Sequence, residues 1–154
     1  MLEARFNTKA HISAAGLDPR PFFDPVRCQY YSSAILEQLE KDLPAGDSKV
    51  LGVSGLDLFI PILTYVFGEA RLNGRSAVVS SYRLDNKLYG LPENPQLLWE
   101  RLFKEAIHEL GHTFGLTHCK NAECVMKSST YMEEIDTKST QFCKICTEKT
   151  YIGF

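Results

Sequence analysis

The chain is 154 residues long and 44% of them are apolar, with 17 basic residues against 19 acidic ones for a net charge of -2. Chains of this length bury about 70% of their unfolded surface, so the sequence predicts one globular domain and disfavours two independent ones. No apolar run reaches the roughly 18 residues of a membrane span, and no long run of one charge sign favours nucleic acid or an anionic membrane as a partner.

The N-terminal part of the chain combines a weak strand pattern, a loop and one helix. Residues 4–12 have weak strand character, and the prolines between Asp18 and Pro25 predict a loop. From Tyr30 to Leu43 apolar residues recur at helical spacing, which predicts an amphipathic helix that ends before Pro44.

The middle of the chain predicts strands. Lys49–Val53 is a short apolar run after a turn, and Ser76–Tyr82 combines serines with the β-branched Val78 and Val79, so both indicate strands, the second of them buried. Between them, Val66–Leu72 fits an extended edge segment that leads to a turn at Asn73. The conformation of Asp57–Phe67 stays open because a proline interrupts this apolar stretch.

Gln96–Phe114 is the clearest helix in the chain, because its leucines and Ala106 repeat along one face as a wide apolar stripe. His108 and His112 fall on a different line of this helix. That line continues towards the N-terminus with three charged residues: Arg101, Lys104 and Glu105. The two histidines therefore stand at the edge of the core, where a cleft can reach them. Strands and helices alternate before residue 95, so we expect an α/β fold with a mixed twisted sheet that carries the long helix.

The stretch from His108 to His118 carries the chemistry. Two histidines four apart on a helix lie on one face, so His108 and His112 can share one ion. Gly115 tolerates positive φ, so the helix can end there and the chain can turn back to bring in His118 as a third ligand. Three imidazoles leave a fourth position open for water, as in a catalytic zinc site, and Glu109 can face that water as the general base. Chance surface or core histidines are the alternative, but three of the chain's four histidines occur here at the required spacings.

Four of the five cysteines form two short pairs in the tail, Cys119 with Cys124 and Cys143 with Cys146. This spacing predicts a closed four-cysteine zinc site, which would order a tail with little periodic pattern. His118 and Cys119 are adjacent and point to opposite sides of an extended chain, so we expect two separate zinc ions. Disulfides are the alternative, although a cytosol keeps thiols reduced. Lysines and acids balance in the tail, which disfavours a zinc ribbon that binds nucleic acid.

The first residues and the cysteine count also bear on location. The chain does not open with the pattern of a signal peptide, and an odd number of cysteines does not suit an oxidised scaffold. We therefore expect a soluble, cytoplasmic and monomeric protein.

These motifs closely resemble those of the archaemetzincin family of zinc metalloproteases. The histidine motif is followed directly by Cys119, then by Cys-Val-Met at 124–126 and Cys-Lys-Ile-Cys at 143–146. The resemblance also covers three other stretches: 29–30, 66–70 and 76–84.

The resemblance implies a metzincin-like fold. An upper subdomain (about residues 1–115) would hold the sheet and the active-site helix, a small zinc-stapled lower subdomain (about residues 116–154) would follow, and the cleft would lie between them. Met126 would form a methionine turn beneath the catalytic zinc. An edge strand would pair antiparallel with an extended peptide substrate. The candidate residues of that strand are Val66, Phe67, Gly68, Glu69 and Ala70. The family's first strand and first helix are expected to be short or absent.

Two further side chains stand outside these motifs. Cys28 occupies a position where the family commonly has a small or basic residue, and we interpret it as a buried thiol without chemistry. Tyr131 is the nearest candidate for a side chain that helps zinc to hold the oxyanion.

The residues and the resemblance together predict a zinc-dependent metalloprotease, which hydrolyses peptide bonds with a zinc-bound water activated by Glu109. We expect two Zn²⁺ per chain, one catalytic and one structural, and a peptide or protein as substrate. Two alternatives stay open: a zinc hydrolase of a small amide or ester, and a noncatalytic peptide-binding module with two zincs. The sequence does not separate aminopeptidase from endopeptidase action.

Overall fold

A computed structural model describes residues 2–14 and 16–150 of the chain. The α-helices in this part are α1 (Leu2–Phe6), α2 (Ser32–Lys41), α3 (Pro95–Thr113), α4 (Met132–Thr137) and α5 (Lys144–Thr150). The 3-10 helices are η1 (Arg20–Phe22), η2 (Tyr82–Leu84) and η3 (Asn86–Tyr89). The strands are β1 (Phe23–Asp24), β2 (Gln29–Tyr31), β3 (Val50–Ser54), β4 (Leu58–Phe59), β5 (Gly68–Ala70) and β6 (Ser76–Ser80).

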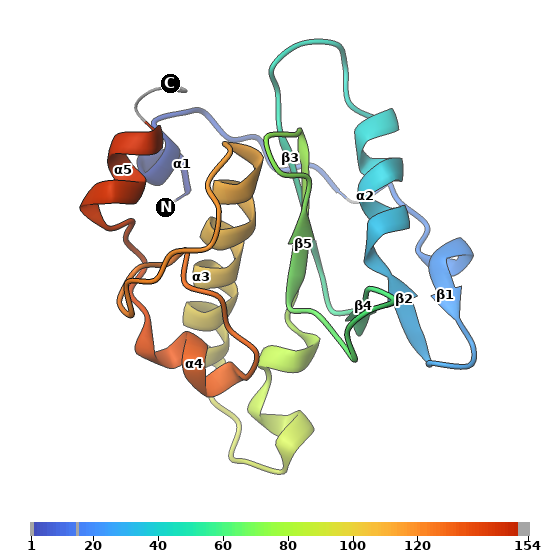
Figure 1. Cartoon of the computed structure of the whole chain (residues 1–154). Helices are drawn as coiled ribbons and strands as arrows, with labels where there is room; N and C mark the ends of the chain where they lie inside the picture. The colour runs from blue at the N-terminus through green and yellow to red at the C-terminus, as the bar shows by residue number, and fades with distance from the viewer. Residues whose placement is uncertain (1, 15, 151–154) are drawn as a thin grey trace.

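The central sheet has the strand order β3-β6-β5 and lies between two helices (Figure 1). β6 pairs parallel with β3 and antiparallel with β5, so the sheet is mixed, as predicted. α2 and α3 cover opposite faces of this sheet, which is why every residue of β6 is buried (Figure 1). On each face of the sheet, a glycine lets a side chain of the covering helix approach the strand closely. Gly52 of β3 lies against Leu39 of α2, whereas Gly68 of β5 lies against Glu109 of α3.

A second sheet has the order β1-β2-β4. β2 pairs antiparallel with β1 and parallel with β4, and an isolated bridge joins Leu58 of β4 to Val66. The stretch Asp57–Phe67, whose conformation the sequence left open, therefore contains a short strand and a turn. Tyr30 and Tyr31 belong to β2, so the helix that follows begins at Ser32.

Residues suited to a helix N-terminus begin α3. The side-chain oxygen of Asn94 accepts a hydrogen bond from the N–H of Leu97 (3.0 Å), and Pro95 occupies the first turn. The cap satisfies one of the N–H groups that a helix leaves unpaired at its start, and proline needs no such partner.

The other end of α3 is set by Gly115, whose φ is 85°. Its N–H donates to the carbonyl of His112 (2.9 Å), and the N–H of Leu116 donates to the carbonyl of Gly111 (3.0 Å). These two bonds form a Schellman motif, which needs a residue that accepts positive φ. The prediction that the helix ends at this glycine is confirmed.

The N-terminal segment differs from the prediction. Residues 4–12 were expected to have strand character, but α1 covers Leu2–Phe6, so that expectation is wrong. Phe6 stacks on Phe114 of α3 with 5.1 Å between ring centroids, and Arg5 donates to the hydroxyl of Thr140 (3.2 Å). α1 thus lies beside α3 and the tail (Figure 1), although the sequence assigned residues 1–115 to an upper subdomain. Burial of an aromatic side chain outweighs weak local strand propensity.

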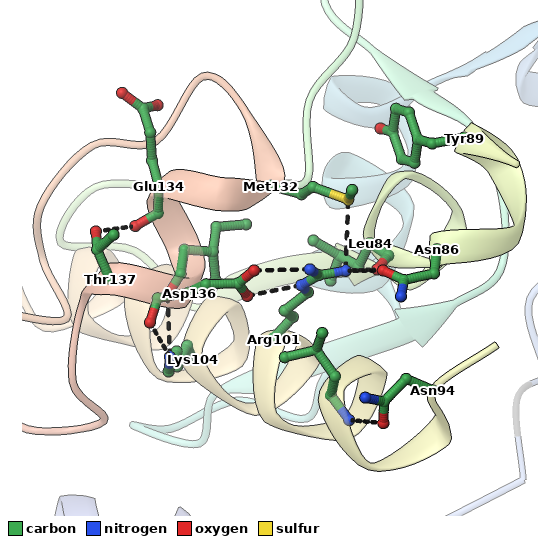
Figure 2. A network of polar contacts seen from close by, with 12 residues as sticks. Leu84, Asn86, Tyr89, Asn94, Arg101, Lys104, Met132, Glu134, Asp136 and Thr137 are labelled. Atoms are coloured by element: carbon green, nitrogen blue, oxygen red, sulfur yellow. Dashed lines mark hydrogen bonds and ion pairs between the residues drawn. The ribbon is translucent and has the colours of Figure 1, made fainter. Parts of the chain in front are cut away.

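α4 covers the charged residues that precede the histidines on α3. Arg101 is 3% exposed and donates to both carboxylate oxygens of Asp136 at 2.7 Å and to the carbonyl of Leu84 at 2.8 Å (Figure 2). Lys104 donates to the carbonyl of Asp136 (3.2 Å), near the C-terminal end of α4 where a cation is favourable (Figure 2). α4 therefore holds this part of α3 to the tail.

A buried ion pair continues this attachment towards the histidines. Lys138 is fully buried, and its Nζ lies 2.8 Å from Oε1 of Glu105 and donates to the carbonyl of Lys127 at 3.0 Å. Buried charges need such partners because desolvation is costly. The pair fastens the segment between the two cysteine pairs to the turn of α3 just before His108.

The other predicted elements are confirmed as α2, β3, β6 and α3, and β5 lies at the sheet edge within the segment 66–72. The sequence did not predict α4 and α5. Among the described residues, no helix has the length and apolar content that a membrane span requires.

Candidate metal centres

Three histidine rings meet beside α3. Nε2 of His108 and Nε2 of His112 are 3.1 Å apart, and ligand nitrogens of these two rings and of His118 all lie within 4.8 Å of one another. Two nitrogens that bind one tetrahedral zinc at about 2.0–2.1 Å are roughly 3.3 Å apart. The spacing of the first two rings therefore suits zinc, and the third ring closes the group after the turn at Gly115.

Backbone carbonyls orient the first two rings. Nδ1 of His108 lies 2.8 Å from the carbonyl oxygen of Val125, and Nδ1 of His112 lies 2.7 Å from that of Leu116. A carbonyl only accepts, so Nδ1 carries the proton in both rings and Nε2 keeps its lone pair for a metal.

The environment keeps these two rings neutral. Burial lowers the pKa of His108 well below its usual value, and the ammonium of Lys138 acts in the same direction. Burial also lowers the pKa of His112. A neutral imidazole is the form that binds metal, so both rings are prepared for it at pH 7.

Glu109 lies in the narrow space between α3 and β5 and is 6% exposed. A Cβ atom at Gly68 would lie 2.7 Å from Cγ of Glu109 and 2.6 Å from the carbonyl oxygen of Val78. Only glycine leaves room for the carboxylate here. Burial and the neighbouring carboxylate of Glu105 raise the pKa of Glu109 well above its usual value, while Lys138 acts in the opposite direction, as a zinc ion would.

β5 is an edge strand with one side directed away from β6. Phe67 accepts a hydrogen bond from Ser80 (2.8 Å) and Arg71 donates one to Ser76 (3.0 Å), so alternate residues point their backbone groups at β6. The N–H and C=O groups of Gly68 and Ala70 consequently point to the other side. The carboxylate of Glu69 instead binds the hydroxyls of two serines in α2. Of the five candidate substrate-strand residues, two thus offer backbone groups at this edge.

Met126 packs directly beneath α3 and is fully buried. A Cβ atom at Gly111 would lie 2.5 Å from its sulfur, so the glycine between the two histidines allows this close approach. The carbonyl of Val125, one residue earlier, holds His108. The turn around Met126 therefore supports the histidine group from below.

The four tail cysteines form a second group. Sγ of Cys119 lies 3.7 Å from Sγ of Cys143, Sγ of Cys124 lies 3.8 Å from Sγ of Cys146, and all four sulfurs lie within 4.8 Å of one another. Tetrahedral zinc–sulfur bonds of about 2.3 Å place sulfurs roughly 3.8 Å apart, whereas a disulfide needs about 2.05 Å. All five cysteines of the chain are free, so the disulfide alternative is wrong.

The thiols differ in how readily they ionise. A hydrogen bond from the backbone N–H of Cys146 is the main cause that lowers the pKa of Cys143 to about 7, while burial raises the pKa values of Cys124 and Cys146. One thiol therefore ionises near neutral pH without a metal. A bound zinc would deprotonate the others. Sulfur donors at tetrahedral spacing make this group fit a structural zinc.

Two candidate residues belong to neither group. Cys28 was expected to be buried, but it is exposed at a φ of 54°, and its Sγ faces the carbonyl of Pro25 at 3.6 Å. Tyr131 is 63% exposed and caps the start of α4. Sequence reasoning also missed the ion pair of Glu105 and Lys138 and the close contact at Gly111. A glycine inside a helix costs about 1 kcal/mol, so Gly111 itself was a signal of close packing.

Comparison with known proteins points to one family. The sequence profile described as peptidase family M54 matches residues 19–151. The archaemetzincin of Methanopyrus kandleri is 45% identical over 130 residues, which are 84% of this chain and 70% of that protein. The archaemetzincin of Methanocaldococcus jannaschii is 45% identical over 123 residues, 80% of this chain and 66% of that protein.

A solved structure agrees with the sequence matches. The crystal structure of archaemetzincin from Archaeoglobus fulgidus, complexed with malonate, superposes with a TM-score of 0.81 at 38% identity. The superposition covers 96% of this chain and 86% of that one. The sheet, the long helix and the tail described above therefore share one arrangement with that protein.

Proposed function

The chain belongs to peptidase family M54 and is a zinc metallopeptidase; from this premise we propose that Glu109 is its general base and that His108, His112 and His118 hold the catalytic zinc. The observation that carries the proposal is the position of Glu109. It directly follows His108 on α3, and its side chain lies against Gly68 at the edge of β5, where an added peptide strand would run.

The histidines supply a site with one free position. His108 and His112 offer Nε2 lone pairs because backbone carbonyls hold their Nδ1 protons. Zn²⁺ bound by three imidazoles polarises a carbonyl group and lowers the pKa of a ligated water towards 7. The donor set fits this chemistry, which the four-cysteine group cannot perform because it leaves no position open.

Glu109 would transfer the proton in both steps of the reaction. As a carboxylate it accepts a proton from the attacking water, and as a carboxylic acid it delivers that proton to the leaving amine. Burial raises its pKa, which favours the second step, while the ammonium of Lys138 lowers the pKa and favours the first.

The edge of β5 orients the substrate. An extended peptide that pairs antiparallel with β5 would exchange hydrogen bonds with the outward N–H and C=O groups of Gly68 and Ala70. Gly68 lies against Glu109, so these bonds would fix the scissile peptide next to the general base. Positioning of this kind contributes several kcal/mol to catalysis.

The second zinc would be structural. We propose that Cys119, Cys124, Cys143 and Cys146 hold it, giving two zincs per chain, with Met126 supporting the catalytic one from beneath. Thiolate ligands survive in a reducing compartment, which agrees with a cytoplasmic location.

The test is cleavage of a mixed peptide library by the zinc-loaded protein, read by mass spectrometry, with Glu109→Gln as the matched variant. We expect cleavage to fall by at least about 10²-fold in the variant, the usual contribution of a general base. Both proteins should contain the same amount of zinc. Turnover that survives at the wild-type rate in Glu109→Gln would disprove the assignment of the base.

The same experiment separates the alternatives. Cleavage of small esters or amides without cleavage of peptides would favour a hydrolase of small substrates. Binding of library peptides with both zincs present and no cleavage at all would favour a noncatalytic module. Cleavage that requires a free amino terminus would identify an aminopeptidase.

A further inference from the structure

A pocket of about 400 Å³ lies beside the third histidine of the catalytic group. Its walls come from residues 116–121 and from residues 143–149, and His118 is one of its lining residues. Three lysines line it, Lys120, Lys144 and Lys149, and no acidic side chain does. The pocket therefore joins a proposed zinc ligand to a group of cations.

The direction of β5 shows which part of a substrate would reach this pocket. Phe67, just before β5, belongs to a hydrophobic cluster against which Leu98 near the start of α3 packs. The N–H of Asn73, after β5, donates to the carbonyl of His112 (2.8 Å) near the end of α3. β5 and α3 thus run in the same direction (Figure 1). A peptide antiparallel to β5 would have its N-terminal residues at the end of α3, where the chain continues into residues 116–121.

The charge of the pocket is not cancelled by carboxylates. All three lysines are exposed, and none of them forms an ion pair with the described residues. Four thiolates around one Zn²⁺ leave a formal charge of -2, which three ammonium groups exceed. Three of the four cysteines also line the pocket: Cys119, Cys143 and Cys146. These cysteines are buried or half-buried whereas the lysines are exposed, so the ammonium groups are the charges that an entering side chain would meet first.

We propose that this pocket makes the enzyme prefer peptides with acidic side chains on the N-terminal side of the scissile bond. The proposal rests on the function proposed above, because it assumes that the peptide substrate pairs antiparallel with β5. Lys144 and Lys149, which lie on α5, are the specificity-determining residues, and Lys120 contributes from the opposite wall.

The test is a binding measurement that does not need turnover. Zinc-loaded Glu109→Gln protein is titrated into N-terminally labelled octapeptides by fluorescence anisotropy: four glutamates then four alanines, four glutamines then four alanines, and four alanines then four glutamates. We expect the first peptide to bind about fivefold more tightly than the other two, as a few exposed ion pairs allow. Adding Lys144→Gln and Lys149→Gln should reduce this preference to less than about twofold.

A matched control removes the same charge elsewhere. Lys9→Gln with Lys41→Gln should leave the preference unchanged, because neither lysine lines the pocket. The proposal is wrong if wild-type lysines give no preference for the first peptide, if the third peptide binds as well as the first, or if the preference survives in Lys144→Gln with Lys149→Gln.

The zinc content of the double lysine variant tests the remaining possibility, which is that the lysines serve only to balance the negative charge of the thiolates. In that case the double lysine variant loses zinc and the peptide preference is unchanged, which overturns the proposal. If the double lysine variant loses both zinc and the peptide preference, the preference is measured again in the protein with intact lysines at different salt concentrations. A preference due to exposed charges must fall steeply between 50 mM and 500 mM NaCl. Failure of the library to be cleaved would refute the proposed function alone, because the binding test is independent of it.

Discussion

The histidine group and the cysteine group are joined by one peptide bond, between His118 and Cys119, yet the fold builds them differently. Two of the three histidines stand on α3, a long capped helix in the core. All four cysteines come from the tail, where the described helices are only 6 and 7 residues long. The histidine group has a scaffold without metal, whereas short helices and loops give the cysteine group little order of its own.

The dependence between the two groups runs mainly in one direction. Cys119 directly follows the third histidine, and Cys124 directly precedes Val125, whose carbonyl orients His108 (2.8 Å). A metal held by the cysteines would therefore fix both the third ligand and the support of the first. The reverse effect is weaker, because the loss of a histidine ligand leaves α3 in the core with its contacts to the tail.

The largest expected effect is the loss of the cysteine zinc in Cys143→Ser. Structural zinc contributes on the order of 10 kcal/mol to small folded units, so the tail should lose order. We expect zinc to fall from two per chain to one, and the remaining zinc to be removed by a chelator at lower concentration than in wild type. Elemental analysis and chelator titration measure both quantities.

His112→Ala is the reciprocal variant. It should also reduce zinc to one per chain, but the tail should keep its order, seen as unchanged protection of tail amides from hydrogen exchange. Equal loss of tail order in both variants would break the proposed asymmetry, as would two zincs retained in Cys143→Ser.

The next effect concerns an attachment between tail and helix that needs no metal. Lys138→Met leaves the carboxylate of Glu105 buried without its partner at 2.8 Å. Loss of one member of a buried pair costs about 3–5 kcal/mol, so the midpoint of denaturant unfolding should fall strongly. The double variant Glu105→Leu with Lys138→Met should recover most of this loss, because an apolar pair leaves no unpaired charge. If Lys138→Met is as stable as wild type, the pair does not hold the tail.

The contrast between the two regions also explains what the sequence could predict. Both ligand sets were found because a metal site imposes spacing along the chain: four residues on a helix for His108 and His112, and short pairs for the cysteines. The turn at Gly115 was predicted because glycine accepts positive φ whatever residues surround it. The long helix and β6 were found because their apolar periodicity is strong.

Contacts between distant segments were not predictable in this way. The burial of Arg101 was not predicted because α4, which covers it, has no clear periodic signal of its own. α1 was missed because the partner that stabilises it, Phe114, lies more than 100 residues away in the sequence. The need for glycine at position 68 depends on where Glu109 and Val78 lie, which only the folded chain shows.

Gly68→Ala should separate catalysis from metal binding. The new methyl would lie 2.7 Å from Cγ of Glu109 and 2.6 Å from the carbonyl of Val78, so the carboxylate and the strand must shift. Overpacking of this kind costs about 1–3 kcal/mol. We expect peptide cleavage to fall at least about tenfold while both zincs are retained. Gly55→Ala is the matched control, since its Cβ would meet only Ser81 at an ordinary 3.7 Å. Wild-type turnover in Gly68→Ala would show that Glu109 does not need its present position.

The smallest effect is expected at the start of α3, far from both metal groups. Asn94→Ala removes the oxygen that caps the N–H of Leu97 at 3.0 Å, which costs about 1 kcal/mol, whereas Asn94→Ser keeps an acceptor and should cost little. Denaturant unfolding measures the difference, and zinc content should stay the same in both variants. This result matters for the comparison, because it shows whether a small loss of helix stability alone releases zinc. If Asn94→Ala loses the histidine zinc, then the loss of zinc in other variants reports helix stability rather than the removal of a ligand.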